Sequence, residues 1–363
     1  MNGLGRILAS ETNVSDLLAY FTEEDPTPWS DLLGALPARA IREGRASTEK
    51  RADLLLMDAA GDTIGAVEVK LGHHLSEAQS DWYLSTFAAD VPLLLTSLDQ
   101  EDPHDSALDP QWTVAPLPSL VGRWMESTNS EVAVLAAAAT RVLESWSALI
   151  TAVSVGVDGR EAESLSSISD PFLGRVLTRA LKPAVVKAGA DRAYPGVTSG
   201  GGNALLQSWR AFPQRQEGQN AIAEVRWQPA ARKMDFRFGV HVLPDGRAER
   251  EAAWHLATTL DEAIRIDSFS DYLRETDPDR AGLLLTDKGS GRPSAKGDWA
   301  EIVEKGFERG DASRYNPGFR RDGDTRFEAS VRIDTTQATG PDIVALLGHA
   351  LDYLTESWPL RSS

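Results

Sequence analysis

The chain has 363 residues, of which 42% are hydrophobic and 25% charged, with a formal net charge of −17 and no cysteine. This length and composition predict a soluble globular protein of two domains. The lack of cysteine excludes disulfides, thiolate zinc sites and cysteine nucleophiles, and it favours a cytoplasmic location. No apolar run is long enough to span a membrane, and no G-x-x-x-x-G-K-[ST] motif indicates a built-in ATP motor.

The first half of the chain alternates between helical and strand patterns. A helix is expected over residues 6–21, and a short helix over 29–36. Two apolar strands, 53–57 and 63–70, flank a turn rich in Gly and Asp, so we expect a β-hairpin. The remaining predicted elements are a helix from Ser76, strands at 91–96 and 112–114, and helices at 118–125 and 131–150.

Charged residues cluster at the end of this predicted hairpin. Residues two apart on a strand share a face, so Glu68 and Lys70 point the same way and Val69 points into the opposite layer. If the hairpin closes, Asp53 lies beside them. Two carboxylates are a usual protein contribution to a Mg²⁺ site that also binds phosphate oxygens. Such a metal activates water and polarises a phosphodiester, and an adjacent ammonium stabilises the developing charge.

The order Asp53, fourteen residues, then Glu68-Val69-Lys70 resembles the catalytic pattern of the PD-(D/E)XK nuclease superfamily. Gln79-Ser-Asp-Trp-Tyr83 has the Q-x-x-x-Y form of the helix that follows the hairpin in RecB-like members, and residues i and i+4 share a helix face. Glu11 opens a predicted first helix, where many members carry a metal-facing Glu. One departure from the family pattern is Ala52, which precedes Asp53 in place of Pro.

The resemblance covers residues 1–150 and implies a restriction-endonuclease-like domain, an α/β fold with a mixed sheet flanked by helices. It implies that Asp53, Glu68 and Glu11 bind Mg²⁺ or Mn²⁺. It also implies that Lys70 positions or activates water, while Gln79 and Tyr83 support the site and touch the substrate.

The rarity of lysine in this chain supports a functional role for Lys70. The chain has 8 Lys and 29 Arg, and Glu68-Val69-Lys70 is its only acid-x-Lys triplet. A compact ammonium and a planar guanidinium are not interchangeable, and the ammonium suits a crowded metal site. The alternative is a buried strand that simply ends in charged residues.

The charge distribution bears on a nucleic-acid partner, because nucleic-acid affinity depends on neutralising phosphates. Residues 1–150 carry 9 Lys and Arg against 23 Asp and Glu, so the excess of acid lies in the candidate catalytic domain. Five of the nine basic residues fall just before Asp53. We predict that they contact nucleic acid, and the alternative is a solvated linker; they are Arg39, Arg42, Arg45, Lys50 and Arg51.

The second half is predicted to be an α+β domain over residues 165–363, after a boundary within 151–169. Strands are expected at 204–212, 221–228, 233–243, 281–286 and 326–333, and a loop at 196–203. Alternation predicts a sheet with one wet face, with Trp227, Phe236 and Phe238 opposite Arg226 and Arg237 and therefore in the core. This domain is expected to select substrate, form a homodimer or receive a protein partner.

The sequence therefore predicts a divalent-metal-dependent nuclease that hydrolyses DNA, and the family's habits suggest phage defence or DNA repair. Two alternatives stay open. The same site would serve an RNA-directed nuclease, because RNA recognition draws on the 2′-hydroxyl and on unpaired bases. A non-catalytic interaction or regulatory protein on the same fold would fit the acidic surface.

Overall fold

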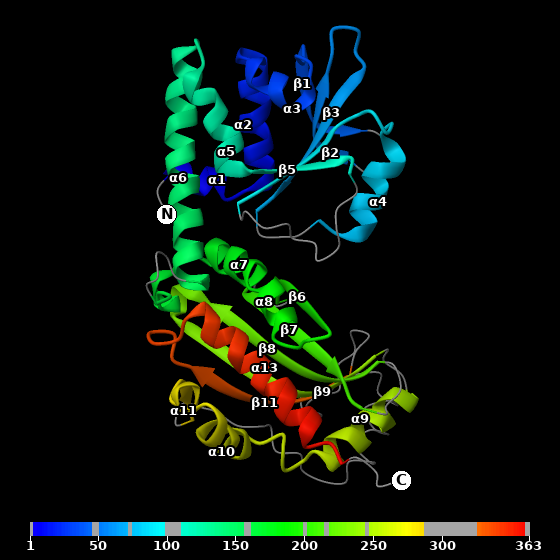
Figure 1. The fold of residues 1–363 in the computed structure, drawn as a ribbon, viewed down its shortest axis with the longest axis vertical. Helices are drawn as coiled ribbons and strands as arrows, with labels where there is room; N and C mark the ends of the chain where they lie inside the picture. Colours follow the sequence, from blue (N-terminus) through cyan, green and yellow to red (C-terminus); the bar gives the residue numbers. More distant parts are fainter. Residues whose placement is uncertain are drawn as a thin grey trace. The chain divides into compact units, whose positions relative to one another are not determined.

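A computed structural model describes residues 3–45, 51–71, 75–98, 110–155, 161–198, 202–213, 218–243, 247–286 and 325–359. The chain divides into two compact units, Met1–Thr151 and Ala152–Ser363. Each unit contains one β-sheet with helices packed against it (Figure 1). The chain is therefore mixed α/β, with a separate sheet in each unit.

The first unit is built on a mixed sheet of five strands in the order β1-β2-β3-β4-β5. β1, β2 and β3 pair antiparallel, whereas β3, β4 and β5 pair parallel. The strands are β1 (Arg39–Arg45), β2 (Arg51–Met57), β3 (Thr63–Lys70), β4 (Leu93–Ser97) and β5 (Trp112–Pro116). The helices are α1 (Gly3–Leu8), α2 (Glu11–Glu24), η1 (Thr27–Trp29), α3 (Ser30–Leu33), α4 (Glu77–Thr86), α5 (Leu117–Gly122), η2 (Arg123–Glu126) and α6 (Ser130–Ser154).

Both faces of this sheet are buried, which is why its central strands read as continuous apolar runs. Residues on one face, including Leu55 and Leu95, pack with Tyr83 of α4. Figure 1 shows α4 on one side of the sheet and α2 and α5 on the other. The predicted mixed sheet with flanking helices is confirmed.

Two predictions for the first unit need correction. The predicted helix 6–21 is two helices, because Ser10 ends the first and caps the second by accepting a hydrogen bond from the Asn13 N–H. The basic stretch, whose alternative interpretation was a solvated linker, contains edge strand β1. Ile41 on β1 packs against the core under α4, but the surrounding Arg residues hide the apolar signal of this strand.

Helix α6 is the one described helix that is long and apolar enough to cross a membrane by length and composition. Its buried residues recur at helical spacing, as at Val132, Ala136, Leu143 and Ile150. The helix therefore has one buried side and one exposed side, and its residues as far as Thr151 belong to the first unit.

The second unit contains an antiparallel sheet of six strands in the order β10-β11-β9-β8-β7-β6. The strands are β6 (Arg192–Val197), β7 (Ala204–Ala211), β8 (Gln219–Gln228), β9 (Lys233–Val242), β10 (Leu284–Leu285) and β11 (Thr325–Ile333). The helices are η3 (Leu165–Ser167), α7 (Pro171–Ala180), α8 (Lys182–Lys187), η4 (Pro229–Ala231), α9 (Arg247–Thr259), α10 (Ile266–Thr276), α11 (Pro278–Ala281) and α13 (Gly340–Glu356).

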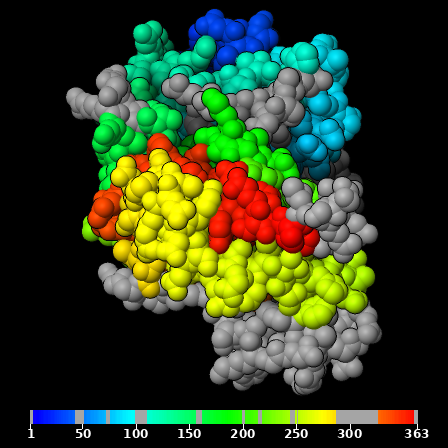
Figure 2. All heavy atoms as spheres, turned by 60° about the horizontal axis from the view of Figure 1, so that its bottom comes forward, coloured from blue at the N-terminus to red at the C-terminus, as the bar shows by residue number. Residues whose placement is uncertain are grey.

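The aromatic core of this unit lies on one face of the sheet. Phe236 and Phe238 stack against Phe269 of α10, and Phe269 also contacts Tyr353 of α13. Figure 2 shows α10 (yellow) beside α13 (red). The prediction that Trp227, Phe236 and Phe238 belong to the core is confirmed, since each is at most 1% exposed.

Two details of the second sheet differ from the prediction. The segment 196–203, predicted to be a loop, begins inside β6, a strand that the sequence pattern does not reveal. The face opposite the aromatics, predicted to be wet, contains buried charge, because Glu224 is 0% exposed.

We expect Gly239→Ala to destabilise the second unit. A Cβ on Gly239 would lie 2.0 Å from the Phe327 backbone oxygen on the neighbouring strand β11, so the strand must move. We expect a loss of about 1–3 kcal/mol in the free energy of unfolding, measured by urea denaturation. Gly3→Ala is the control, since no atom of the described residues lies within 4 Å of its Cβ position. Equal stability of the two variants would contradict the close approach of β9 and β11.

Candidate functional site

The hairpin of β2 and β3 brings three of the predicted residues together. Glu68 and Lys70 point to the same side of β3 and form an ion pair. Val69 between them is fully buried in the opposite layer. The paired register of the hairpin runs as far as Leu54 and Val67. Beyond this pair, the Asp53 carboxylate accepts a hydrogen bond from the Val69 N–H at 2.8 Å.

Helix α4 holds the Glu68 carboxylate from the other side. Gln79 Nε2 donates to Glu68 Oε1 at 2.5 Å, and the Tyr83 hydroxyl donates to Glu68 Oε2 at 2.5 Å. Ser76 begins this helix by capping the Gln79 N–H. The i, i+4 spacing thus places both donors on the face of α4 that meets the sheet. Glu68 is 1% exposed and Tyr83 is 0% exposed. The carboxylate is therefore buried and held by two hydrogen bonds from α4.

Glu11 reaches the same end of the sheet from α2. It is the first residue of this helix, and its Oε1 accepts a hydrogen bond from the Leu71 N–H at 2.9 Å. Leu71 directly follows Lys70 at the end of β3. The structure thus brings Glu11, Asp53, Glu68, Lys70, Gln79 and Tyr83 to one place, although they come from four elements.

The charges at this place do not balance, because three carboxylates surround one ammonium. Burial and the neighbouring Glu68 raise the pKa of Asp53 from 3.8 to about 7, although the Val69 N–H and Lys70 oppose the shift. Burial would lower the pKa of Lys70, but Glu68 and Glu11 outweigh it and raise that pKa. Burial and Glu68 likewise raise the pKa of the Tyr83 hydroxyl. Lys70 is therefore protonated at neutral pH.

The carboxylates of Asp53 and Glu68 are suitable ligands for a divalent cation. Burial raises the pKa of Asp53 most, and repulsion from Glu68 adds to the shift. A cation would relieve that repulsion, and two carboxylates are enough for Mg²⁺ when substrate and water complete the shell. The described residues do not form a group of three or more His, Asp or Glu side chains arranged to hold a metal. Asp53 and Glu68 would hold the ion. Glu11 stays a predicted ligand, with one oxygen bound to the Leu71 N–H.

The predicted nucleic-acid residues have mixed surroundings. Arg42 forms an ion pair with Asp16 of α2, which leaves less of its charge for phosphates. Arg39 is exposed. Arg51 is also exposed and lies two positions before Asp53 on β2, on the same face. Arg45 ends β1 opposite Arg51 in the register, and Lys50 lies outside the described residues.

Comparison with protein-family models, curated proteins and solved structures gave no match for this chain. Function must therefore be inferred from the site itself. Sequence reasoning missed the two backbone groups that orient the carboxylates, the N–H groups of Val69 and Leu71. Almost every residue has such a group, so no residue type marks the ones that matter.

The raised pKa of Asp53 predicts a pH-dependent stability in EDTA. An acid whose folded pKa exceeds its unfolded pKa binds more protons when folded, so stability falls as pH rises between the two values. Between pH 5 and pH 7 we expect the wild type to lose about 2–3 kcal/mol relative to Asp53→Asn. Urea denaturation of both proteins at several pH values measures the difference. Parallel pH profiles for wild type and variant would contradict the shift.

Proposed function

We propose that this protein is a divalent-metal-dependent nuclease that hydrolyses DNA phosphodiester bonds. The observation that carries the proposal is the fixed carboxylate of Glu68. It is held by Gln79, Tyr83 and Lys70, and Asp53 enters from the adjacent strand. A purely structural ion pair needs one acid and one base. The additional carboxylates of Asp53 and Glu11 raise the electrostatic cost of this site, and a bound cation would offset that cost.

The arrangement of the first sheet supports the same proposal. Its three antiparallel strands continue into two parallel strands, and the carboxylates lie on the hairpin of the antiparallel part. We interpret this unit as a restriction-endonuclease-like domain of the PD-(D/E)XK type. The composition without cysteine is consistent with a protein of the cytoplasm, where such an enzyme would meet DNA.

Each side chain has a separate role in this proposal. A divalent cation bound by Asp53 and Glu68 would polarise the phosphate and lower the pKa of the attacking water. Lys70, which stays protonated, donates a hydrogen bond to the water or to the phosphate oxygen as negative charge develops. Gln79 and Tyr83 fix the orientation of Glu68. Glu11 fixes the backbone that follows Lys70.

The test is cleavage of labelled single-stranded DNA, duplex DNA and RNA in Mg²⁺ or Mn²⁺. We expect Asp53→Asn and Lys70→Ala each to lower the rate by about 100-fold or more, because each removes charge stabilisation in the transition state. EDTA should abolish cleavage. Matched controls are Asp90→Asn and Lys187→Ala, which change exposed residues away from the site.

Cleavage that persists in both site variants would refute the assignment. Faster cleavage of RNA than of either DNA would favour the RNA-directed alternative. A wild type that cuts nothing and binds no Mn²⁺ in calorimetry would favour the non-catalytic interaction protein.

Tyr83→Phe tests the hydrogen bond that holds the Glu68 carboxylate, because it removes only one oxygen atom. The variant removes the hydrogen bond to Glu68 Oε2 and keeps the ring that packs against Trp82 and Trp112. Loss of such a supporting bond typically weakens metal binding or activity by about 10–100-fold. We expect this loss in the Mn²⁺ affinity measured by calorimetry. Tyr20→Phe on α2 is the control, and equal affinity of the two variants would remove Tyr83 from the site.

A further inference from the structure

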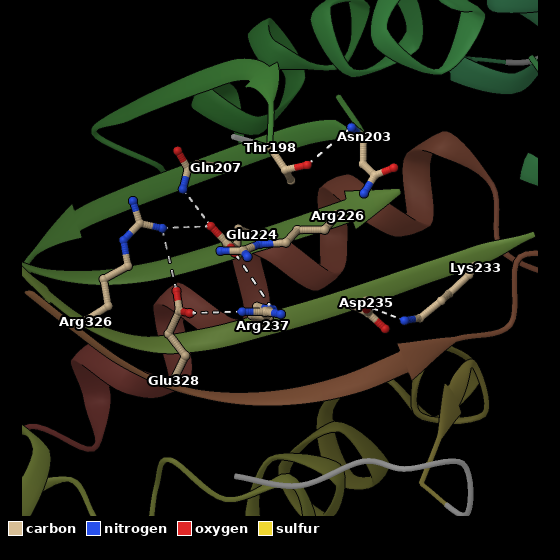
Figure 3. Close-up of polar contacts among 10 residues, drawn as sticks. All are labelled: Thr198, Asn203, Gln207, Glu224, Arg226, Lys233, Asp235, Arg237, Arg326 and Glu328. Atoms are coloured by element: carbon tan, nitrogen blue, oxygen red, sulfur yellow. Dashed lines mark hydrogen bonds and ion pairs between the residues drawn. The ribbon is translucent and has the colours of Figure 1, made fainter. Parts of the chain in front are cut away.

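The sheet of the second unit has two unlike faces. One face carries Trp227, Phe236 and Phe238, and α7, α10 and α13 pack there, as the contacts of Trp227 with Gly174 and of Phe269 with both phenylalanines show. The register places polar and charged residues on the opposite face. Four neighbouring strands, β7, β8, β9 and β11, contribute to it (Figure 3).

A buried carboxylate organises this charged face. Glu224 on β8 is 0% exposed and accepts hydrogen bonds from Gln207 at 2.6 Å, Arg326 at 2.9 Å and Arg226 at 2.5 Å. Burial would raise the pKa of Glu224, but Arg226 and Arg326 outweigh it and hold that pKa below its ordinary value. Glu224 therefore stays ionised, and it fixes guanidinium groups from two strands.

Two other members of the cluster have unused hydrogen-bonding atoms. Arg237 Nη1 lies 3.7 Å from Glu328 Oε2, and Arg237 Nε lies 4.0 Å from Glu224 Oε1. Both distances exceed a hydrogen bond. Among the described residues, Arg237 Nε and Glu328 Oε1 are buried without a hydrogen-bond partner, although Arg326 Nη1 lies 3.9 Å from Glu328 Oε1. The Glu328 side chain is only 9% exposed. Since a buried polar atom without a partner is costly, these atoms favour a role beyond folding.

Stability alone does not account for the cluster. A buried ion network is often no more stable than apolar side chains of similar volume, because desolvation offsets the attraction. Arg226 and Arg237 keep 18% and 25% of their side-chain exposure. In Figure 3 both guanidinium groups lie near Glu224, which accepts a hydrogen bond from Arg226. The network thus places two partly exposed cations beside one buried carboxylate.

This face is positive although the chain as a whole is strongly negative. The register assigns six basic and three acidic residues to the face on the described strands, whereas the whole chain has a net charge of −17. The basic residues are Arg192, Arg226, Lys233, Arg237, Arg326 and Arg332, and the acidic ones are Glu224, Asp235 and Glu328. A concentration of positive charge on an acidic protein is the electrostatic mark of a polyanion partner.

The same face also carries aromatic residues, on β6 and β7. Tyr194 on β6 is 48% exposed, and its ring lies over Gly196, where a Cβ would approach it to 2.5 Å. The Arg192 guanidinium lies 4.8 Å from the ring centre of Trp209 on β7. An exposed ring beside ordered guanidiniums is suited to stack a base while the cations hold the backbone.

We propose that this charged face of the second sheet binds DNA, with Arg226 and Arg237 contacting backbone phosphates and Tyr194 stacking on a base. Glu224 acts as a positioning residue that fixes Arg226. The choice of DNA as the polyanion rests on the function proposed for the first unit. The binding itself needs neither metal nor catalysis.

The experiment measures fluorescence anisotropy of labelled single-stranded and duplex DNA with the full-length protein in EDTA, over a range of salt concentrations. We expect Arg226→Gln with Arg237→Gln to weaken binding at least about tenfold. The slope of log K against log salt should fall by about 2, since each substitution removes one cation from a phosphate. The matched control is Arg265→Gln with Arg274→Gln, two exposed arginines that pair with acids nearby in the chain.

Because the double variant changes a buried network, thermal unfolding must show that it folds. Tyr194→Ala provides a second measurement outside the network, with an expected loss of about 5-fold to 100-fold in affinity. Wild-type affinity in both variants, or a wild type that binds no DNA, would overturn the proposal. A wild type that binds DNA but cleaves no substrate and binds no Mn²⁺ would refute the nuclease and leave this inference standing.

Discussion

The first unit depends on burial of one carboxylate, that of Glu68. A charge removed from water is unfavourable unless its oxygens have partners, and here an amide, a phenol and an ammonium contact them. These partners come from both β3 and α4. Because the helix must supply two donors, its position against the sheet is fixed by the same bonds that orient the carboxylate. The same hydrogen bonds therefore stabilise the packing of α4 on the sheet and orient the carboxylate.

The charges around Glu68 create a conflict that its partners do not resolve. Lys70 is paired directly with Glu68, and burial together with the charge of Glu68 raises the pKa of Asp53 to about 7. Backbone N–H groups hold the remaining acids in place. In the proposed function, a bound divalent cation would relieve this repulsion between the carboxylates.

The second unit also contains a buried carboxylate, that of Glu224, but its neighbours carry the opposite charge. Glu224 is surrounded by more guanidiniums than it can neutralise, whereas Glu68 is surrounded by acids. Glu224 therefore lies in a cluster where basic groups are in excess, and Glu68 lies in a cluster where acidic groups are in excess. In the proposed function, the first unit lacks the positive charge that DNA requires, and the second supplies it. Under this proposal, the division would explain how an acidic chain acts on a nucleic acid.

The sequence determined the elements whose residues repeat with one period and carry distinctive chemistry. The hairpin, the direction of Glu68 and Lys70 on β3, and the shared face of Gln79 and Tyr83 on α4 follow from the spacing of residues alone. Edge strands β1 and β6 escape recognition from sequence, because arginine, glycine and proline interrupt their apolar pattern. Charged residues and proline are common on edge strands, because they oppose pairing with another chain.

Only the tertiary structure decided which partners each charge meets. The predicted wet face of the second sheet carries Glu224 fully buried, since a period of two separates faces but does not show which charges on neighbouring strands will pair. Likewise, Glu11 meets Leu71, a residue sixty positions away, and no local pattern encodes that contact. Local geometry follows from steric and hydrophobic periodicity along the chain. Long-range electrostatics depends on distances that exist only after the strands and helices have packed.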